Sequence, residues 1–143
     1  MTRIFAALIA GVIAGPVFAD AHGSGDAEAG EKGFKKCKAC HMIASESETI
    51  VKGGKTGPNM YGVAGRTAGT VEGFKYSGDL VAAGEAGLVW DEASLVAFTA
   101  DPKKFLQEFL DDSKAKSKMS FKLKKGGEDI YTYLVSVGPE ASD

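Results

Sequence analysis

Apolar residues recur with a helical period in three parts of the second half of the chain. The clearest runs from about Glu128 to Val137, where apolar residues at i, i+3, i+4 and i+7 form one face. Those residues are Ile130, Tyr133, Leu134 and Val137. Similar patterns predict helices at residues 91–100 and 102–110, the second with Pro102 in its first turn.

Charge predicts another helix, over Gly25–Ala39. Acidic residues lie near its start and lysines toward its end, which complements the helix dipole. The last turn of this helix would lead into the cysteine pair, Cys37 and Cys40. About four to five helices in all, and no convincing strand, indicate an all-α fold.

Two long loops separate the predicted helices. Residues 44–78 contain eight glycines and Pro58 without a sustained apolar period, and residues 111–127 form a second loop. So few helices in a 143-residue chain can bury little apolar surface by themselves. We therefore expect the loops to wrap a large apolar cofactor that completes the core.

The N-terminus has the layout of a signal peptide. Arg3 precedes an uncharged stretch of 16 residues, and Val17-Phe18-Ala19 is a cleavage site, with a second after Ala21. This stretch is shorter than a spanning helix needs, which disfavours an uncleaved anchor. We expect residues 1–19 to be removed and residues 20–143 to form one domain with no membrane span.

Cys37-Lys38-Ala39-Cys40-His41 fits the C-x-x-C-H attachment motif of c-type haem. On one helical turn the two thiols and the imidazole face the same way, so all three can meet one planar ring. Half of a zinc site is disfavoured because only His22 remains as a further ligand. A thioredoxin-like pair lacks its βαβ context, and a disulfide between such close cysteines would be strained.

A sixth iron ligand opposite His41 must be a histidine or a methionine. Met1 leaves with the signal peptide, and Met42 is too close to His41 in sequence to reach the other haem face. Met60 and Met119 remain. Met60 lies in a compact segment that needs apolar anchors, whereas Met119 lies in the second loop, which favours Met119 as the ligand and Met60 as core.

These features resemble the class I c-type cytochromes, and most of all the periplasmic cytochrome c-two group of purple bacteria. The resemblance covers essentially the whole mature chain. Beyond the haem motif it includes Gly30, Phe34, Lys55-Thr56-Gly57-Pro58-Asn59, Gly65-Arg66, Gly73-Phe74-Lys75-Tyr76, Trp90, Asp101-Pro102-Lys103-Lys104-Phe105, Lys118-Met119-Ser120-Phe121 and Tyr133-Leu134.

The resemblance implies a cytochrome c fold around one haem attached at Cys37 and Cys40, with iron held by His41 and Met119. It also implies that the Pro58 carbonyl accepts a hydrogen bond from the His41 ring. Arg66, Tyr76 and Trp90 are implied to hydrogen-bond a buried haem propionate, and Gly30 to let the first and last helices touch.

The chain departs from the family pattern beside Met119. Phe98 stands where the family usually has a tyrosine whose hydroxyl touches the methionine sulfur, and no asparagine follows Tyr76. We therefore expect a less constrained iron–sulfur bond and a reduction potential different from that of relatives with the tyrosine.

A His/Met pair fills the iron coordination sphere, which favours electron carriage over catalysis. We expect a periplasmic carrier, not an enzyme, between a cytochrome bc complex and a photosynthetic reaction centre, a terminal oxidase or a peroxidase. The alternative is a haem enzyme or gas-binding protein with a labile Met119, and a weaker one is a subunit of a larger redox complex.

Lysines are concentrated where a carrier would dock. Residues 101–125 contain eight lysines against four acidic residues, and Lys35, Lys36 and Lys38 flank the haem cysteines. Loss of Arg3 leaves 16 basic against 19 acidic residues in the chain, which together with export disfavours nucleic acid as a partner. We expect a monomer that docks transiently on acidic surfaces of its partners.

Overall fold

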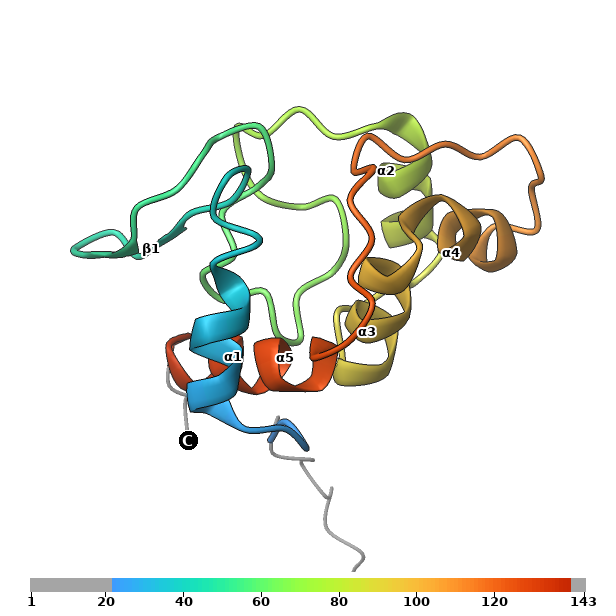
Figure 1. The fold of residues 1–143 in the computed structure, drawn as a ribbon. Coiled ribbons are helices and arrows are strands. Elements are labelled where there is room, and N and C mark those ends of the chain that lie inside the picture. The colour runs from blue at the N-terminus through green and yellow to red at the C-terminus, as the bar shows by residue number, and fades with distance from the viewer. Residues whose placement is uncertain (1–21, 140–143) are drawn as a thin grey trace, which may run out of the picture.

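The computed structural model describes residues 22–139, which form five helices and one two-stranded sheet (Figure 1). The prediction of an all-α protein with four to five helices is confirmed. The predicted signal peptide, residues 1–19, lies outside the described residues. The elements are α1 (Ala27–Phe34), β1 (Ile43–Ala44), β2 (Thr49–Val51), α2 (Gly78–Glu85), α3 (Glu92–Ala100), α4 (Pro102–Phe109) and α5 (Gly127–Ser136).

Helices α1 and α5 cross in close contact, as the resemblance implied for Gly30 (Figure 1). A Cβ on Gly30 would overlap the backbone of Asp129 and the side chain of Tyr133. The Phe34 and Tyr133 rings pack beside the crossing, with centroids 6.1 Å apart. This contact joins the first and last helices and fixes the position of α1, after which the C-x-x-C-H motif follows.

The first helix ends at Phe34 rather than at Ala39, so the predicted boundary was wrong. Its start is close to the prediction, because the Asp26 carboxylate accepts a hydrogen bond from the Ala29 N–H at 2.7 Å. Beyond Phe34 the chain continues in hydrogen-bonded turns, including one from the His41 N–H to the Cys37 carbonyl at 2.9 Å. That i to i+4 bond preserves the local spacing on which the motif depends.

Regular structure also occurs within the segment predicted to be one long loop, residues 44–78, and directly after it. The strands β1 and β2 pair antiparallel, with Ile43 opposite Val51, and α2 follows its N-cap residue Ser77. Gly84 is an interior residue of α2, where a Cβ would overlap the Ala68 carbonyl. Close packing thus required a glycine that weakened the helical signal in the sequence.

The core is one cluster of buried residues to which all five helices and the loops between them contribute. Ile43, Leu106 and Leu134 are fully buried, and Trp90 packs against Phe98 with ring centroids 5.0 Å apart. The three later helices, α3, α4 and α5, begin and end within one residue of their predicted positions. Across residues 22–139, no helix has the length and apolar character needed to cross a membrane.

Candidate haem-binding site

The ring of His41 is held by a hydrogen bond to the backbone of Pro58. Its Nδ1 lies 2.8 Å from the Pro58 carbonyl oxygen, which can only accept, so Nδ1 carries the proton. The other ring nitrogen, Nε2, therefore keeps its lone pair. The contact between His41 and Pro58 that the resemblance implied is present, and it fixes both the tautomer and the orientation of the ring.

Burial strengthens that assignment. It lowers the pKa of His41 below the ordinary value, and the bond to the Pro58 carbonyl offsets the effect only in part. The imidazole is thus neutral at pH 7, the form in which histidine binds a metal.

The loop around Pro58 is packed backbone to backbone against the haem motif. The Gly54 N–H donates to the Lys38 carbonyl at 2.9 Å, and the Gly57 N–H donates to the Cys40 carbonyl at 2.8 Å. A Cβ on Gly57 would overlap the His41 ring, and one on Gly54 would overlap the Ala39 carbonyl. These glycines let the loop approach closely enough for Pro58 to reach the histidine.

The two cysteines are not joined to each other, and they differ in exposure. Cys40 is exposed, whereas Cys37 is partly buried. Burial raises the pKa of the Cys37 thiol to about 11, against a smaller opposing effect of Lys36. A redox pair of the thioredoxin type needs a lowered thiol pKa, so Cys37 fits a thiol used for covalent attachment better than one used for exchange.

Met119 and Cys37 line the same cavity, although 82 positions separate them in the sequence. The remaining lining comes from helices α3 and α5 and from the residues after Met119; it consists of Leu95, Thr99, Phe121, Leu123, Gly127 and Ile130. Met60 does not line this cavity and packs against the core, as predicted. The walls are almost entirely apolar, and with a volume of only about 20 Å³ the cavity marks one apolar edge of the site rather than the space for a whole haem.

Arg66 is linked to both Trp90 and Tyr76, and the bonds of these three residues to a haem propionate stay a prediction. The backbone N–H of Trp90 donates to the backbone carbonyl of Arg66 at 2.9 Å. The Arg66 guanidinium and the Tyr76 hydroxyl interact electrostatically. Burial lowers the pKa of Arg66 and raises that of Tyr76. The Tyr76 oxygen accepts from the Val71 N–H at 3.2 Å, which leaves its hydroxyl proton available for an anionic partner.

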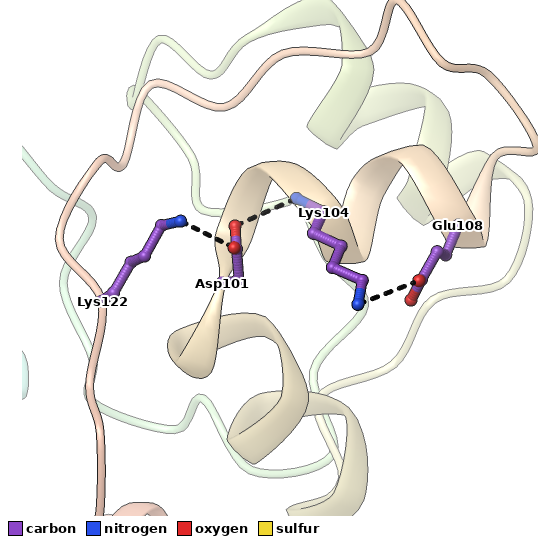
Figure 2. A network of polar contacts seen from close by, with 4 residues as sticks. All are labelled: Asp101, Lys104, Glu108 and Lys122. Atoms are coloured by element: carbon purple, nitrogen blue, oxygen red, sulfur yellow. Dashed lines mark hydrogen bonds and ion pairs between the residues drawn. The ribbon is translucent and has the colours of Figure 1, made fainter.

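The chain after Met119 is tied to helices α3 and α4. The Leu123 N–H donates to the Thr99 carbonyl at 2.8 Å, and the Lys122 ammonium lies 2.7 Å from the Asp101 carboxylate. Figure 2 shows that Asp101 also accepts from the Lys104 backbone N–H at the start of α4. The Asp101 carboxylate thereby caps α4 and also holds the segment that follows Met119.

Asn59 has a structural role that the sequence did not reveal. Its side-chain oxygen accepts from the Ala44 and Tyr61 N–H groups, both at 3.1 Å, and its amide donates to the Ala44 carbonyl at 2.7 Å. It thereby clips the loop that carries Pro58 to strand β1. The only signal was an asparagine placed directly after that proline, which by itself indicates a turn.

Comparison with known proteins places the chain in a family, although no model of a protein family matches it. It is 59% identical to cytochrome c-551 of Roseobacter denitrificans over 99% of this chain and 100% of that protein. It is 55% identical to cytochrome c2 of Rhodobacter capsulatus over 88% of this chain and 89% of that protein. The crystal structure of cytochrome c2 from Paracoccus denitrificans matches with a TM-score of 0.79 at 48% identity, over 82% of this chain and 100% of that one.

The fold and the C-x-x-C-H site define the chain as a class I c-type cytochrome. Within that class it belongs to the cytochrome c2 group of the α-proteobacteria, which includes proteins named cytochrome c-550 and c-551. The resemblance noted from the sequence is confirmed, and electron transport is the function of the group.

Proposed function

We propose that this protein is a soluble, monomeric periplasmic carrier of single electrons, with one haem attached through Cys37 and Cys40 and iron bound by His41 and Met119. The observation that supports this most strongly is that Cys37 and Met119, far apart in sequence, line one apolar cavity. His41, whose ring is held by Pro58 with Nε2 unprotonated, would supply the second iron ligand.

The residues present fit a haem in each of its parts. The cavity walls are apolar, Arg66 and Tyr76 provide a charge and a hydroxyl for propionates, and Cys37 and Cys40 provide the thiols. Once bound, the haem iron would change oxidation state by one electron, and a neutral thioether ligand favours the reduced form. Two protein ligands leave no open position, which suits a carrier rather than an enzyme.

The proposed partners are a cytochrome bc complex as donor, and a photosynthetic reaction centre, a terminal oxidase or a peroxidase as acceptor. Exposed lysines on α4 and in the loops that flank Met119 support docking to acidic surfaces. Export by the signal peptide at residues 1–19 would deliver the carrier to the periplasm, where such partners expose their docking sites.

The alternative is a haem enzyme or gas-binding protein in which Met119 leaves the iron. Such a protein would use an acid–base pair on the distal side, and the cavity that contains Met119 is lined by apolar side chains together with Thr99. A six-coordinate oxidised spectrum that is unaffected by nitric oxide or cyanide at modest concentration would favour the carrier.

Flash-induced electron transfer in native membranes tests the proposal directly. A strain that lacks this protein should lose a kinetic phase of electron delivery, and the added holoprotein should restore it with a rate that falls as salt rises. Lys103→Gln/Lys124→Gln, which removes two exposed positive charges, should slow that phase and flatten its salt dependence, whereas Lys32→Gln, which removes a charge already paired with Glu28, should not. Unchanged kinetics in the deletion strain would contradict the proposal.

A further inference from the structure

The chain leading into Met119 is tied to helix α2 by one carboxylate. The Lys116 N–H donates to Asp79 Oδ2 at 2.8 Å, across 37 positions of sequence. Figure 1 shows this stretch, in orange, running past α2 before it descends along α3. Asp79 lies in the first turn of α2, so the loop that carries Met119 is attached to an element elsewhere in the chain.

The neighbouring residues hold the same stretch in place. Ala115 is 1% exposed, and the Gln107 amide on α4 donates to the Ser113 carbonyl at 2.8 Å and to the Ala115 carbonyl at 3.3 Å. Lys116 is therefore presented to Asp79 by a loop already seated on α4. The Asp79 bond lies only three residues before Met119.

Helix α2 is a firm support for this attachment. Ala83 is fully buried, and Gly84 packs so closely on the Ala68 carbonyl that a Cβ would overlap it. A second long-range contact just before Met119 is a bond from the Lys118 ammonium, on an exposed side chain, to the Lys75 carbonyl at 3.0 Å. A bond between a charged carboxylate and a backbone N–H holds the main chain itself and loses less side-chain entropy than a long lysine does.

We propose that Asp79 is a positioning residue that holds the Met119 loop closed, so that its carboxylate opposes replacement of Met119 on the iron by an external ligand. This inference rests on the proposed ligation of iron by Met119. Asp79 touches neither the cavity nor Met119 and acts through the backbone of Lys116. Opening of the loop must break the Asp79 bond. The free energy needed to break it weakens the binding of any ligand that competes with Met119.

The affinity of the oxidised holoprotein for imidazole measures this cost. Asp79→Ala removes the acceptor, and we expect it to bind imidazole about five- to tenfold more tightly than the wild type. Asp79→Asn keeps a side-chain oxygen that can accept from Lys116, so its affinity should stay within about twofold of the wild type. Glu85→Gln removes a charge from the other end of α2 and should change nothing.

Two outcomes would assign the effect to α2 itself. Asp79 also lies in the first turn of α2, where a negative charge stabilises the helix. An Asp79→Asn effect as large as that of Asp79→Ala would therefore reject the role of the bond between Asp79 and Lys116. Ser77→Ala removes the N-cap that accepts from the Leu80 N–H at 3.3 Å without touching the loop. An equal gain in imidazole affinity in Ser77→Ala would likewise overturn it.

The wild-type spectrum separates this inference from the proposal beneath it. A missing sulfur-to-iron charge-transfer band in the oxidised wild type would reject Met119 as the ligand, whatever Asp79 does. With that band present in the wild type, an imidazole affinity of Asp79→Ala equal to that of Glu85→Gln would reject the role of Asp79 alone.

Discussion

The two sides of the proposed haem site are built differently. On the His41 side, residues 53–59 press their backbone against residues 38–41, with no room for side chains at the glycines. On the Met119 side, a long loop is attached mainly through the side chains of Asp79, Gln107 and Lys122, with one backbone bond from Leu123 to Thr99. Backbone packing has one close arrangement, whereas side-chain ties can break one at a time. The first side should therefore be permanent and the second able to open.

The largest effect should come from closing the space between the loop and the histidine. Gly57→Ala places a Cβ within the His41 ring, and neither backbone segment can move away without losing the bond from Gly57 to Cys40. We expect a loss of more than about 4 kcal/mol in the free energy of unfolding, seen as little or no recovered holoprotein. Gly78→Ala is the matched control, because nothing lies within 4 Å of its added Cβ.

A smaller loss should follow removal of the clip on the same side. Asn59→Ala leaves the Ala44 and Tyr61 backbone groups without their partner, which should cost about 2–3 kcal/mol in the free energy of denaturant unfolding. Imidazole affinity should stay within about twofold of the wild type, because the Met119 loop is untouched. A gain as large as that expected for Asp79→Ala would erase the distinction between the two sides.

Phe98 tests the predicted departure from the family pattern beside Met119. It is 8% exposed and packs between Trp90 and Phe105, with ring centroids 5.0 and 5.8 Å away. A tyrosine hydroxyl that donates a hydrogen bond to the Met119 sulfur would withdraw electron density from that sulfur. Phe98→Tyr should then raise the reduction potential by about 40 mV, the equivalent of about 1 kcal/mol for one electron. An unchanged potential and unchanged imidazole affinity would reject the predicted role of Phe98.

The smallest effect concerns pH. The hydrogen bonds from Lys122 and from the Lys104 N–H hold the pKa of Asp101 below its ordinary value. A carboxylate with a lowered folded-state pKa stabilises the fold at neutral pH, and this contribution is lost as pH falls through that pKa. Asp101→Asn should therefore lose less stability than the wild type between about pH 5 and about pH 3. Glu108→Gln, which breaks only the exposed pair with Lys104 at 3.7 Å, should follow the wild type.

The sequence predicted the parts of the fold that depend on local pattern. The apolar face of α5 and the proline at the start of α4 located those helices closely. Prediction from the sequence failed where tertiary contacts determine the extent of a helix. Helix α1 stops at Phe34, and the chain continues to His41 in hydrogen-bonded turns that the charge pattern did not distinguish from helix. Helix α2 was not predicted, and it contains Gly84, which weakens a helical pattern but is required by contact with Ala68.

The site divides in the same way. Cys37, Cys40 and His41 are adjacent, so their spacing was enough to predict them, and Pro58, Arg66, Tyr76, Trp90 and Met119 came from an ordered family pattern. Asn59 and Asp79 act on backbone groups 15 and 37 positions away, and no local pattern marks such partners. Their roles became visible only when the loops were seen packed against their neighbours.

The near-infrared spectrum of the oxidised protein tests most directly whether His41 and Met119 close the iron site. We expect a sulfur-to-iron charge-transfer band in the wild type, the same band in Met60→Leu, and its loss in Met119→Leu together with tighter imidazole binding. A band that survives in Met119→Leu and disappears in Met60→Leu would contradict the account, as would a five-coordinate wild type.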